Sequence, residues 1–469
     1  METQPSARPI GSRRSLIALA LIVVVFLALR LVFLAARDPF FDELFTRWVS
    51  AQPFGSMIEA LRHDSGPPLY YALIHLLGTP DVPALRLVSL LFAGVSLLAI
   101  LRAGWMGEGR LIAAALLAVY PPAVVFAVDA RAYALCAMCV ALGVLALARA
   151  RTYASALAFV AAAYSHYYGV LFFPLLLAAP LVARRRLRRA DAIAFAAAVL
   201  AFVPALLLAL QQPKEATAWF AQRWPSLLDF GFISIYPTAL FATAPRVLIV
   251  AAFVVTVGVL SRMTSGRAAG GEWQVGEAGN ARALFATATL IPIAGIIVLA
   301  LLGRPAYFSM RFASVLAAPF ALWLAASLMA WPRRVRMTLL ALLLIAGGVA
   351  SYIGVVDAMQ RPIDPYRQAA LALRDNAWPT DRIVASGFLY LESRSALGPR
   401  VMPFGAEQGE HPGWRARPPA SSEAPPAEAF LWIGERGAPE LRLLRRTREV
   451  RPLFMNERAI VVRVGPAVR

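Results

Sequence analysis

Long apolar runs separated by short polar segments fill the chain from residue 16 to residue 356, and their lengths predict membrane-spanning helices. A helix needs about 20 residues to cross the hydrocarbon core of a bilayer, and apolar runs near this length recur throughout this region. The pattern therefore predicts a polytopic α-helical membrane protein. About eleven spans are expected, at residues 16–36, 84–102, 111–128, 132–150, 153–165, 167–183, 190–210, 246–260, 283–302, 311–331 and 336–356.

The first run, Leu16–Ala36, is longer than the apolar core of a signal peptide. It follows Arg13 and Arg14, and no small-residue cleavage site comes after it. We therefore expect it to be a retained first span. The apolar stretch around His166 is divided into two spans, because without this division the later basic clusters would change sides of the membrane.

Basic residues gather in the connectors between the runs, for example "RRRLRR" at 184–189 and "RRVR" at 333–336. This is the distribution that the positive-inside rule predicts for cytoplasmic loops, with anionic-lipid contact as a lesser alternative. The net charge of +19 therefore does not indicate a nucleic-acid-binding protein. The composition agrees: 59% of the residues are hydrophobic and 16% are charged, whereas a soluble domain has about 25% charged residues.

With a cytoplasmic N-terminus, residues 37–83 form a long first loop on the outer side. Pro67 and Pro68 favour the start of a short helix there, which is too short to cross the bilayer and is expected to lie along the interface. Residues 225–244 are amphipathic and predict a second outer interfacial element, whereas the Gly-rich segment 265–280 predicts a loop.

After residue 356 the sequence becomes Pro- and Arg-rich with ordinary polarity, which predicts a separate domain over 357–469. Helical periodicity marks "DPYRQAALALRDNAW", and "DRIVASGF", "AFLWIGER" and "RAIVVRV" are typical of short strands. The stretch "RARPPASSEAPPAE" predicts a loop. The expected architecture is thus a membrane domain over 1–356, including the outer loop 37–83, followed by a small outer α/β domain.

Candidate chemistry lies at the outer ends of the predicted spans, beginning with the adjacent acids Asp42 and Glu43 in "RDPFFDELFTRW". Ionisable groups at membrane depth are costly, so each is a candidate for function; snorkelling at the interface is the alternative. The other polar residues expected on this face are His63, Asp64, Tyr70, Asp129, Arg131, Tyr133, His166, Tyr167, Tyr168, Arg304, Tyr307 and Arg311.

Arginines and carboxylates on one face suit transfer of a sugar from a lipid phosphate. Arginine binds phosphate through two parallel hydrogen bonds and stays charged at any relevant pH. A carboxylate can take the proton of an acceptor hydroxyl while the phosphate leaves. Neither a metal ion nor an organic cofactor is required.

Simpler roles compete at several of these positions. Asp42 is also a good residue to cap a short helix over 44–49, and Glu43 fits a supporting role better than that of a second base. His166 could equally be a hydrogen-bonded interfacial residue, and Tyr70 and Tyr167 suit an interfacial aromatic belt. Asp129 is expected to pair with Arg131 or a neighbour. The pair Cys136 and Cys139, in "CAMC" within a span, is expected to pack rather than to bind zinc or act in redox chemistry.

The ordered motifs "FFDE", "PPLYYALIHLLG", "ALRLVSLLFAG", "DARAYAL" and "SHYYG" resemble the glycosyltransferase C superfamily. The likeness covers residues 15–330 and is strongest to bacterial protein mannosyltransferase-like enzymes, including lipopolysaccharide core galacturonosyltransferases. It implies a polyprenyl-phosphate-linked donor, with Asp42 as the base and Glu43 as its neighbour. Arg131, Arg304 and Arg311 are candidates for binding the donor phosphate. Many relatives have a His or Lys just before the Pro-Pro pair where this chain has Gly66, and His63 is the nearest candidate for that contact.

The sequence thus predicts a glycosyltransferase of the bacterial inner membrane. It would move a hexose or a pentose from the polyprenyl-phosphate donor to a hydroxyl of a lipid, glycan or protein acceptor on the periplasmic face. A transporter or lipid flippase is a competing interpretation, but it would need polar residues near the middle of the bilayer and usually repeated halves. A non-catalytic envelope assembly protein is another.

Overall fold

The structure is a computed structural model that describes residues 13–212, 281–302, 310–360, 363–386, 389–404 and 428–467. These residues fall into two compact units. The first, the helical unit, takes its described residues from Met1–Arg37, Pro83–Leu207 and Ala218–Gln360. The second, the mixed unit, takes them from Asp38–Val82, Leu208–Thr217 and Arg361–Arg469. The predicted division of the chain after residue 356 stays a prediction.

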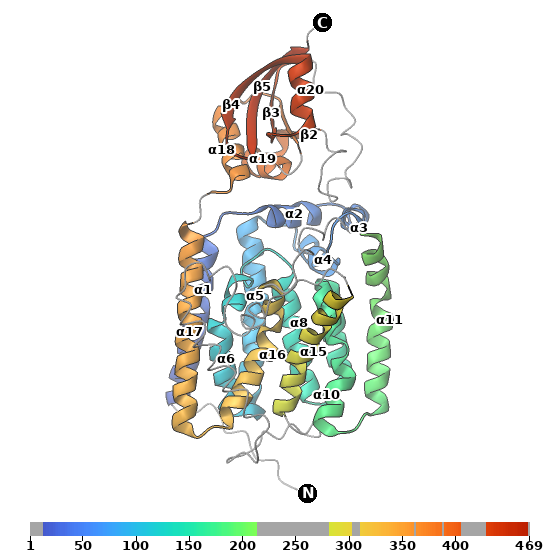
Figure 1. Cartoon of the computed structure of the whole chain (residues 1–469), viewed down its shortest axis with the longest axis vertical. Helices are drawn as coiled ribbons and strands as arrows, with labels where there is room; N and C mark the ends of the chain where they lie inside the picture. Colours follow the sequence, from blue (N-terminus) through green and yellow to red (C-terminus); the bar gives the residue numbers. More distant parts are fainter. Residues whose placement is uncertain are drawn as a thin grey trace. The chain divides into compact units, whose positions relative to one another are not determined.

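The helical unit consists of apolar helices joined by short connectors (Figure 1). Helix α16 contacts α6, α8 and α15, and it is by far the most enclosed of the long helices, with 94% of its apolar window buried. The helices and 3-10 turns of this unit are α1 (Arg13–Ala35), α5 (Val82–Leu101), η1 (Gly104–Met106), α6 (Gly109–Val119), α7 (Pro121–Val125), α8 (Tyr133–Ala148), α9 (Thr152–Ser165), η2 (Tyr167–Phe172), α10 (Leu175–Arg184), α11 (Arg189–Gln211), α15 (Ala281–Leu301), α16 (Met310–Met329) and α17 (Arg333–Gln360).

Six of the described helices are long and apolar enough to cross a membrane: α1, α5, α11, α15, α16 and α17. The prediction of a polytopic helical protein is therefore confirmed, but the count of eleven spans is not. Helices α6 and α8 and the segment 167–182 are apolar but shorter. The predicted span 246–260 and the segments 225–244 and 265–280 lie outside the described residues.

The chain breaks its helix at His166, where the sequence divided one apolar stretch into two. Helix α9 ends at Ser165 and η2 begins at Tyr167. The two elements pack closely, because a Cβ atom added at Gly169 would lie 2.3 Å from backbone atoms of Ala162 and Ala163. Glycine at 169 thus permits η2 to fold back against the helix that precedes it.

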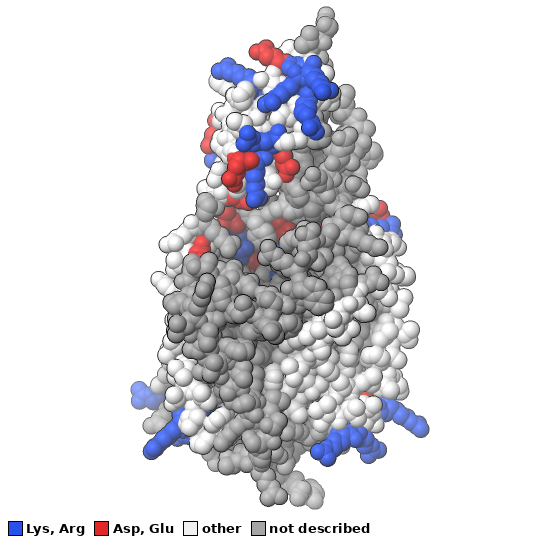
Figure 2. Space-filling model, viewed as in Figure 1, with Lys and Arg blue, Asp and Glu red and all other residues white. Residues whose placement is uncertain are grey.

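The exposed charged side chains of the described helical unit lie towards the ends of its helices, whereas Arg30 is buried within α1. Figure 2 shows Lys and Arg gathered at the end of this unit where the N mark stands in Figure 1, with uncharged residues along the helices. The described connectors contain Arg102, Arg149, Arg151 and Arg188, and Arg334 lies in the first turn of α17. This is the separation of charge from apolar length that a bilayer imposes.

The mixed unit joins the first loop to the C-terminal residues. Its five-stranded sheet has the order β2-β1-β3-β5-β4, with β2, β1 and β3 parallel and β5 antiparallel to both of its neighbours. Its elements are α2 (Phe41–Ser50), α3 (Phe54–Arg62), α4 (Leu69–Leu76), α18 (Pro365–Asn376), β1 (Ile383–Ser386), α19 (Leu389–Leu397), η5 (Gly398–Arg400), β2 (Val401–Phe404), β3 (Phe430–Glu435), α20 (Pro439–Thr447), β4 (Arg448–Met455) and β5 (Ala459–Ala467).

One face of this sheet packs against α20 through a buried apolar cluster. Alternate residues of β3 and β5 point into it, as the twofold period of a strand requires. Trp432 is completely buried, and its indole N–H donates a hydrogen bond of 2.9 Å to the hydroxyl of Ser386. The predicted helix after residue 364 and the three predicted strands are all present, whereas the predicted loop 415–428 lies outside the described residues except for its last position.

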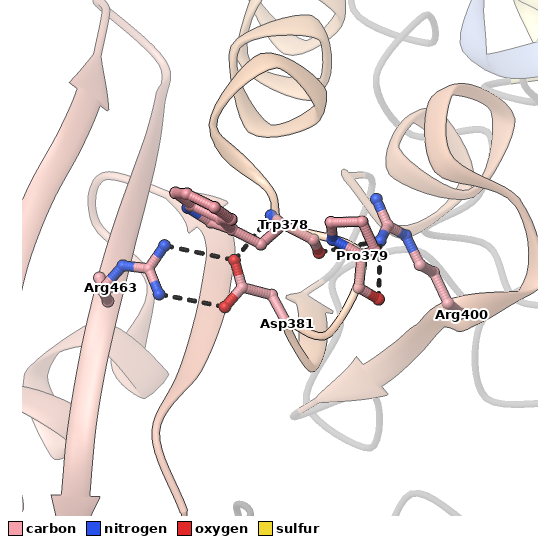
Figure 3. A network of polar contacts seen from close by, with 5 residues as sticks. All are labelled: Trp378, Pro379, Asp381, Arg400 and Arg463. Atoms are coloured by element: carbon pink, nitrogen blue, oxygen red, sulfur yellow. Dashed lines mark hydrogen bonds and ion pairs between the residues drawn. The ribbon is translucent and has the colours of Figure 1, made fainter.

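A polar network fixes the turn between α18 and β1 (Figure 3). The Asp381 carboxylate accepts two hydrogen bonds from Arg463 of β5, at 3.1 and 3.2 Å, and one of 2.9 Å from the Trp378 backbone N–H. Arg400 donates to the Trp378 carbonyl at 3.0 Å from the other side. The turn is therefore tied to the middle of the sheet and to η5.

Candidate active site

The acidic pair lies in the first turn of α2, in the mixed unit. Phe40 is the N-cap residue, so Asp42 occupies the second helical position and does not cap the helix. Asp42 is half-buried, and negative charge there is stabilised by the positive end of the helix dipole. Glu43 is completely buried, and its Oε2 accepts a hydrogen bond of 3.4 Å from the Phe40 backbone N–H. This contact supports the helix start and leaves Asp42 as the better candidate for the base.

Aromatic packing holds α2 against α4. The rings of Phe45 and Tyr71 meet edge to face with centroids 6.5 Å apart, and Tyr70 and Tyr71 are both buried. Gly66 permits this packing, because a Cβ atom there would lie 3.3 Å from the Tyr71 ring. Tyr70 is therefore a core residue of this unit, and its predicted contact with substrate stays a prediction.

His63 lies at the C-terminal end of α3. Its Nε2 is 3.4 Å from Oε1 of Glu59, one turn earlier on the same helix. Glu59 also accepts a hydrogen bond of 2.7 Å from Arg62. His63 is thus held by a local pair, and its role at the donor phosphate also stays a prediction.

A cationic cluster in the helical unit brings together residues from the motifs "DARAYAL" and "SHYYG" with Arg311 of α16. Arg311, at the start of α16, lies over the ring of Tyr133, at the start of α8, with 5.7 Å between the guanidinium carbon and the ring centroid. The Tyr133 and His166 rings are 5.2 Å apart. Arg131 and Arg311 both lie close enough to His166 to act on it electrostatically. We call Arg131, Tyr133, His166, Tyr168 and Arg311 the cationic cluster.

His166 is the centre of this cluster. Its Nδ1 accepts a hydrogen bond of 3.2 Å from the Tyr168 backbone N–H, so the proton of the neutral ring lies on Nε2. Its ring lies 4.4 Å from that of Tyr168. Burial favours the neutral form of the ring, and repulsion from Arg131 and Arg311 acts in the same direction. The result is two permanent cations around a neutral N–H donor, which is an arrangement suited to anionic oxygens.

Two of the predicted residues add less to this geometry. Tyr167 begins η2 directly after His166 and is half-buried. Arg304, with its neighbour Tyr307, lies outside the described residues.

Sequence reasoning missed two arginines that shape the site. Arg37 forms an ion pair with the buried carboxylate of Asp129, and Arg86 donates a hydrogen bond of 2.7 Å to the Arg37 carbonyl. The expected partner of Asp129 was Arg131 or a neighbour, and the backbone N–H of Arg131 donates a hydrogen bond of 2.7 Å to the Asp129 carbonyl. The clue to Arg86 was its position inside an apolar run. The Arg37 pair fixes the turn that carries Arg131.

A third arginine repairs the helix break between α6 and α7. In an unbroken helix, the carbonyls of Leu117 and Ala118 would accept from the N–H groups of residues 121 and 122, but these are prolines and have none. The completely buried Arg30 of α1 donates to both carbonyls instead, at 3.3 and 2.9 Å. It also donates to the Ala123 carbonyl at 3.0 Å. The break therefore depends on a side chain from another helix.

Beside Arg30 lies a small cavity of about 30 Å³, lined mostly by apolar side chains and by Tyr133 and Ser314. No group of three or more His, Cys, Asp or Glu side chains is placed to hold a metal ion in the described part of the chain. Cys136 and Cys139 are free thiols buried in α8.

Comparison with known proteins gives no match to any family model and none to any curated protein sequence. Solved structures do match. The chain superposes on ArnT from Cupriavidus metallidurans bound to undecaprenyl phosphate with a TM-score of 0.60 and 14% identity, covering 97% of this chain and 98% of that one. The chain has the glycosyltransferase C fold. At this identity the likeness shows the fold alone.

The apo form of the same ArnT matches with a TM-score of 0.59 and 14% identity over 95% of this chain and 98% of that one. The archaeal oligosaccharyltransferase AglB from Archaeoglobus fulgidus, in complex with an inhibitory peptide and a dolichol-phosphate, matches at 0.48 and 11% identity over 88% of this chain and 69% of that one. The latter score is too low to support further argument. The sequence-based resemblance to the glycosyltransferase C superfamily is thus confirmed for the fold.

Proposed function

We propose that this protein is a membrane glycosyltransferase that takes a sugar from a polyprenyl-phosphate donor and transfers it to a hydroxyl of an envelope acceptor. The cationic cluster is the observation that supports this most strongly. Two arginines from α16 and from the turn before α8 surround a neutral imidazole at the ends of apolar helices. A lipid phosphate needs such a site, because its head is anionic and its chain is apolar.

In the proposed reaction, Arg131 and Arg311 bind the donor phosphate and the Nε2–H of His166 donates a hydrogen bond to it. The carboxylate of Asp42 takes the proton of the acceptor hydroxyl. The hydroxyl oxygen then attacks the anomeric carbon, and the bond from this carbon to the phosphate oxygen breaks. The polyprenyl phosphate leaves with its charge stabilised by the arginines, and the anomeric configuration is inverted.

The chain itself limits how far the base can lie from the fixed turn of the helical unit. Asp42 follows Arg37 by five residues, and an extended chain advances about 3.3–3.6 Å per residue, so their Cα atoms are at most about 18 Å apart. Arg37 is bound to Asp129, two residues before Arg131.

The fold is compatible with a lipid-linked donor, since ArnT with the same fold was solved bound to undecaprenyl phosphate. We propose the bacterial inner membrane as the location and the periplasmic side as the face of reaction, from the distribution of basic connectors. Hexosyl and pentosyl donors both fit the proposal.

The structure gives no support to the transporter interpretation at Arg30, the clearest polar residue within a described span. Arg30 lies inside α1, but its hydrogen bonds go to backbone carbonyls of the α6–α7 break and to the Phe26 carbonyl of its own helix. Its role there is to satisfy main-chain groups. A transported solute would need such polar groups to remain available.

Replacement of the base tests the proposal directly. In proteoliposomes supplied with polyprenyl-phosphate sugar and envelope acceptors, Asp42→Asn is expected to lower the rate of transfer about 100-fold or more, the usual scale for loss of a general base. Asp375→Asn, at an exposed residue of α18, is the matched control. Full activity of the Asp42→Asn protein would point to a non-catalytic role in envelope assembly.

A further inference from the structure

A buried acid lies where the C-terminal helices of the mixed unit meet the first loop. Glu392 of α19 is 3% exposed, and its Oε2 lies 3.8 Å from Nη1 of Arg367 on α18. This distance is too long for a hydrogen bond. Neither of these two buried atoms has a hydrogen-bond partner among the described residues. A buried ion pair without hydrogen bonds adds little stability, so its retention calls for another explanation.

Helix α19 packs against α18 and the sheet, and it also packs against α2, which carries Asp42. Both belong to the mixed unit, so this contact lies within one compact body. Asp38, three residues before the start of α2, acts on Glu392 electrostatically, as does Asp364 at the N-cap of α18. The charged groups facing Glu392 are therefore Arg367, Asp364 and Asp38.

The charge of Glu392 changes near neutral pH. Burial raises the pKa of its carboxyl to about 7, with Asp364 and Asp38 acting in the same direction and Arg367 against them. Below this pH the neutral carboxyl fits the buried site. Above it the carboxylate is disfavoured first by burial; Arg367 attracts it, whereas Asp364 and Asp38 repel it.

We infer that Glu392 is a positioning residue, which holds segment 38–50 against α19 and so sets the position of Asp42. The C-terminal helices are then part of the scaffold for the base, and the hold weakens as Glu392 ionises. The consequence for catalysis rests on the proposed function, whereas the positioning of segment 38–50 against α19 does not. Because the proposed phosphate-binding arginines belong to the helical unit, the effect is expected in kcat and not in KM for the donor.

Hydrogen exchange of the full-length protein in lipid nanodiscs tests the hold without reference to activity. Protection factors for peptides covering 38–50 are compared at pH 6 and pH 8 in the wild type, in Glu392→Gln and in Asp38→Asn. We expect the wild type to lose protection about tenfold at pH 8, the change that one pKa unit represents. Glu392→Gln keeps its shape and cannot ionise, so its protection is expected to stay the same at both pH values. Asp38→Asn removes the repulsion and is expected to reduce the loss.

Peptides of β3 and β5 report whether the domain itself has loosened, and Glu449→Gln, at an exposed residue of β4, is the control variant. The inference is overturned if the protection of 38–50 in Glu392→Gln falls with pH as it does in the wild type. It is also overturned if the protection of β3 and β5 falls as much as that of 38–50.

In transfer assays, Glu392→Gln is expected to flatten the pH profile of kcat while leaving the donor KM unchanged. If no transfer occurs but the exchange result holds, only the proposed function fails. If Asp42→Asn is inactive but exchange is unaffected, only this inference fails.

Discussion

At the scale of single residues, side chains with similar chemistry have different roles because their surroundings differ. Asp42 and Glu43 are adjacent acids, but Glu43 is buried and bonded to the backbone of its own helix start. Arg30, Arg37 and Arg86 bind protein carbonyls or a carboxylate. Arg131 and Arg311 instead surround a histidine. This cationic cluster is where we propose that the donor phosphate binds.

The cationic cluster makes a prediction at this scale. Arg311→Met is expected to weaken binding of polyprenyl phosphate about 10- to 100-fold, because a hydrogen bond to a charged group contributes about 1.5–3 kcal/mol. Binding to the protein in nanodiscs can be titrated with the lipid phosphate alone. Arg334→Met, at an exposed arginine of α17, is expected to bind like the wild type. Equal affinity of the two variants would remove Arg311 from the phosphate site.

At the scale of elements, the helices are broken where the candidate site lies. The α6–α7 break at Pro121 and Pro122 leads into the turn with Asp129 and Arg131, and the α9–η2 break places His166. Each break leaves main-chain groups that need partners. Arg30 supplies them at the first break, and Ser351 of α17 donates a further hydrogen bond of 2.9 Å to the Val119 carbonyl.

Arg30→Met is expected to destabilise the protein by about 3 kcal/mol or more, because it leaves several buried carbonyls without donors. The measurement is thermal unfolding in detergent. The same substitution in a Pro121→Ala/Pro122→Ala background is expected to cost clearly less, because the alanine N–H groups can bond the carbonyls of Leu117 and Ala118. If the stability costs of Arg30→Met and of the proline substitutions are purely additive in a double-mutant cycle, Arg30 does not replace the N–H donors that the prolines lack.

At the scale of the whole molecule, the described residues form two units, each made from segments far apart in the sequence. The first loop, Asp38–Val82, shares its unit with the described residues from Arg361 onward. The covalent path nevertheless crosses between the units at Arg37 and Asp38. A change within the mixed unit can thus reach Asp42 without any change in the arginines of the helical unit.

The stability of the mixed unit is expected to fall as pH rises from about 5 to 8. The pKa of Glu392 lies near 7 in the folded protein and near 4.5 in the unfolded chain, so its contribution is complete below 4.5 and is lost as pH approaches 7. The loss is on the order of 3 kcal/mol, at about 1.4 kcal/mol for each pKa unit. Burial also raises the pKa of Glu440, so Glu392→Gln should reduce the slope without abolishing it. Unfolding followed at several pH values, with Glu449→Gln as control, checks this; a slope unchanged by Glu392→Gln would contradict it.

The sequence by itself determined the features that depend on local patterns. Apolar length and the placement of basic residues indicated the helical membrane class, and short apolar stretches typical of strands marked β1, β3 and β5. The ordered motifs indicated the fold and brought Arg131, His166 and Arg311 into one hypothesis. These predictions succeed because burial in lipid, or against one face of a sheet, leaves its period in the chain.

Tertiary structure alone decided which partner each polar side chain contacts. Nothing in the local sequence of Arg30 shows that Pro121 and Pro122, about ninety residues away, leave carbonyls for it to bind. The same is true of Arg37 with Asp129, and of Glu392 with the segment before α2. Hydrogen bonds and ion pairs act over a few ångströms in space with no regard to distance along the chain. The partner of a charged side chain is therefore fixed only when the helices have packed.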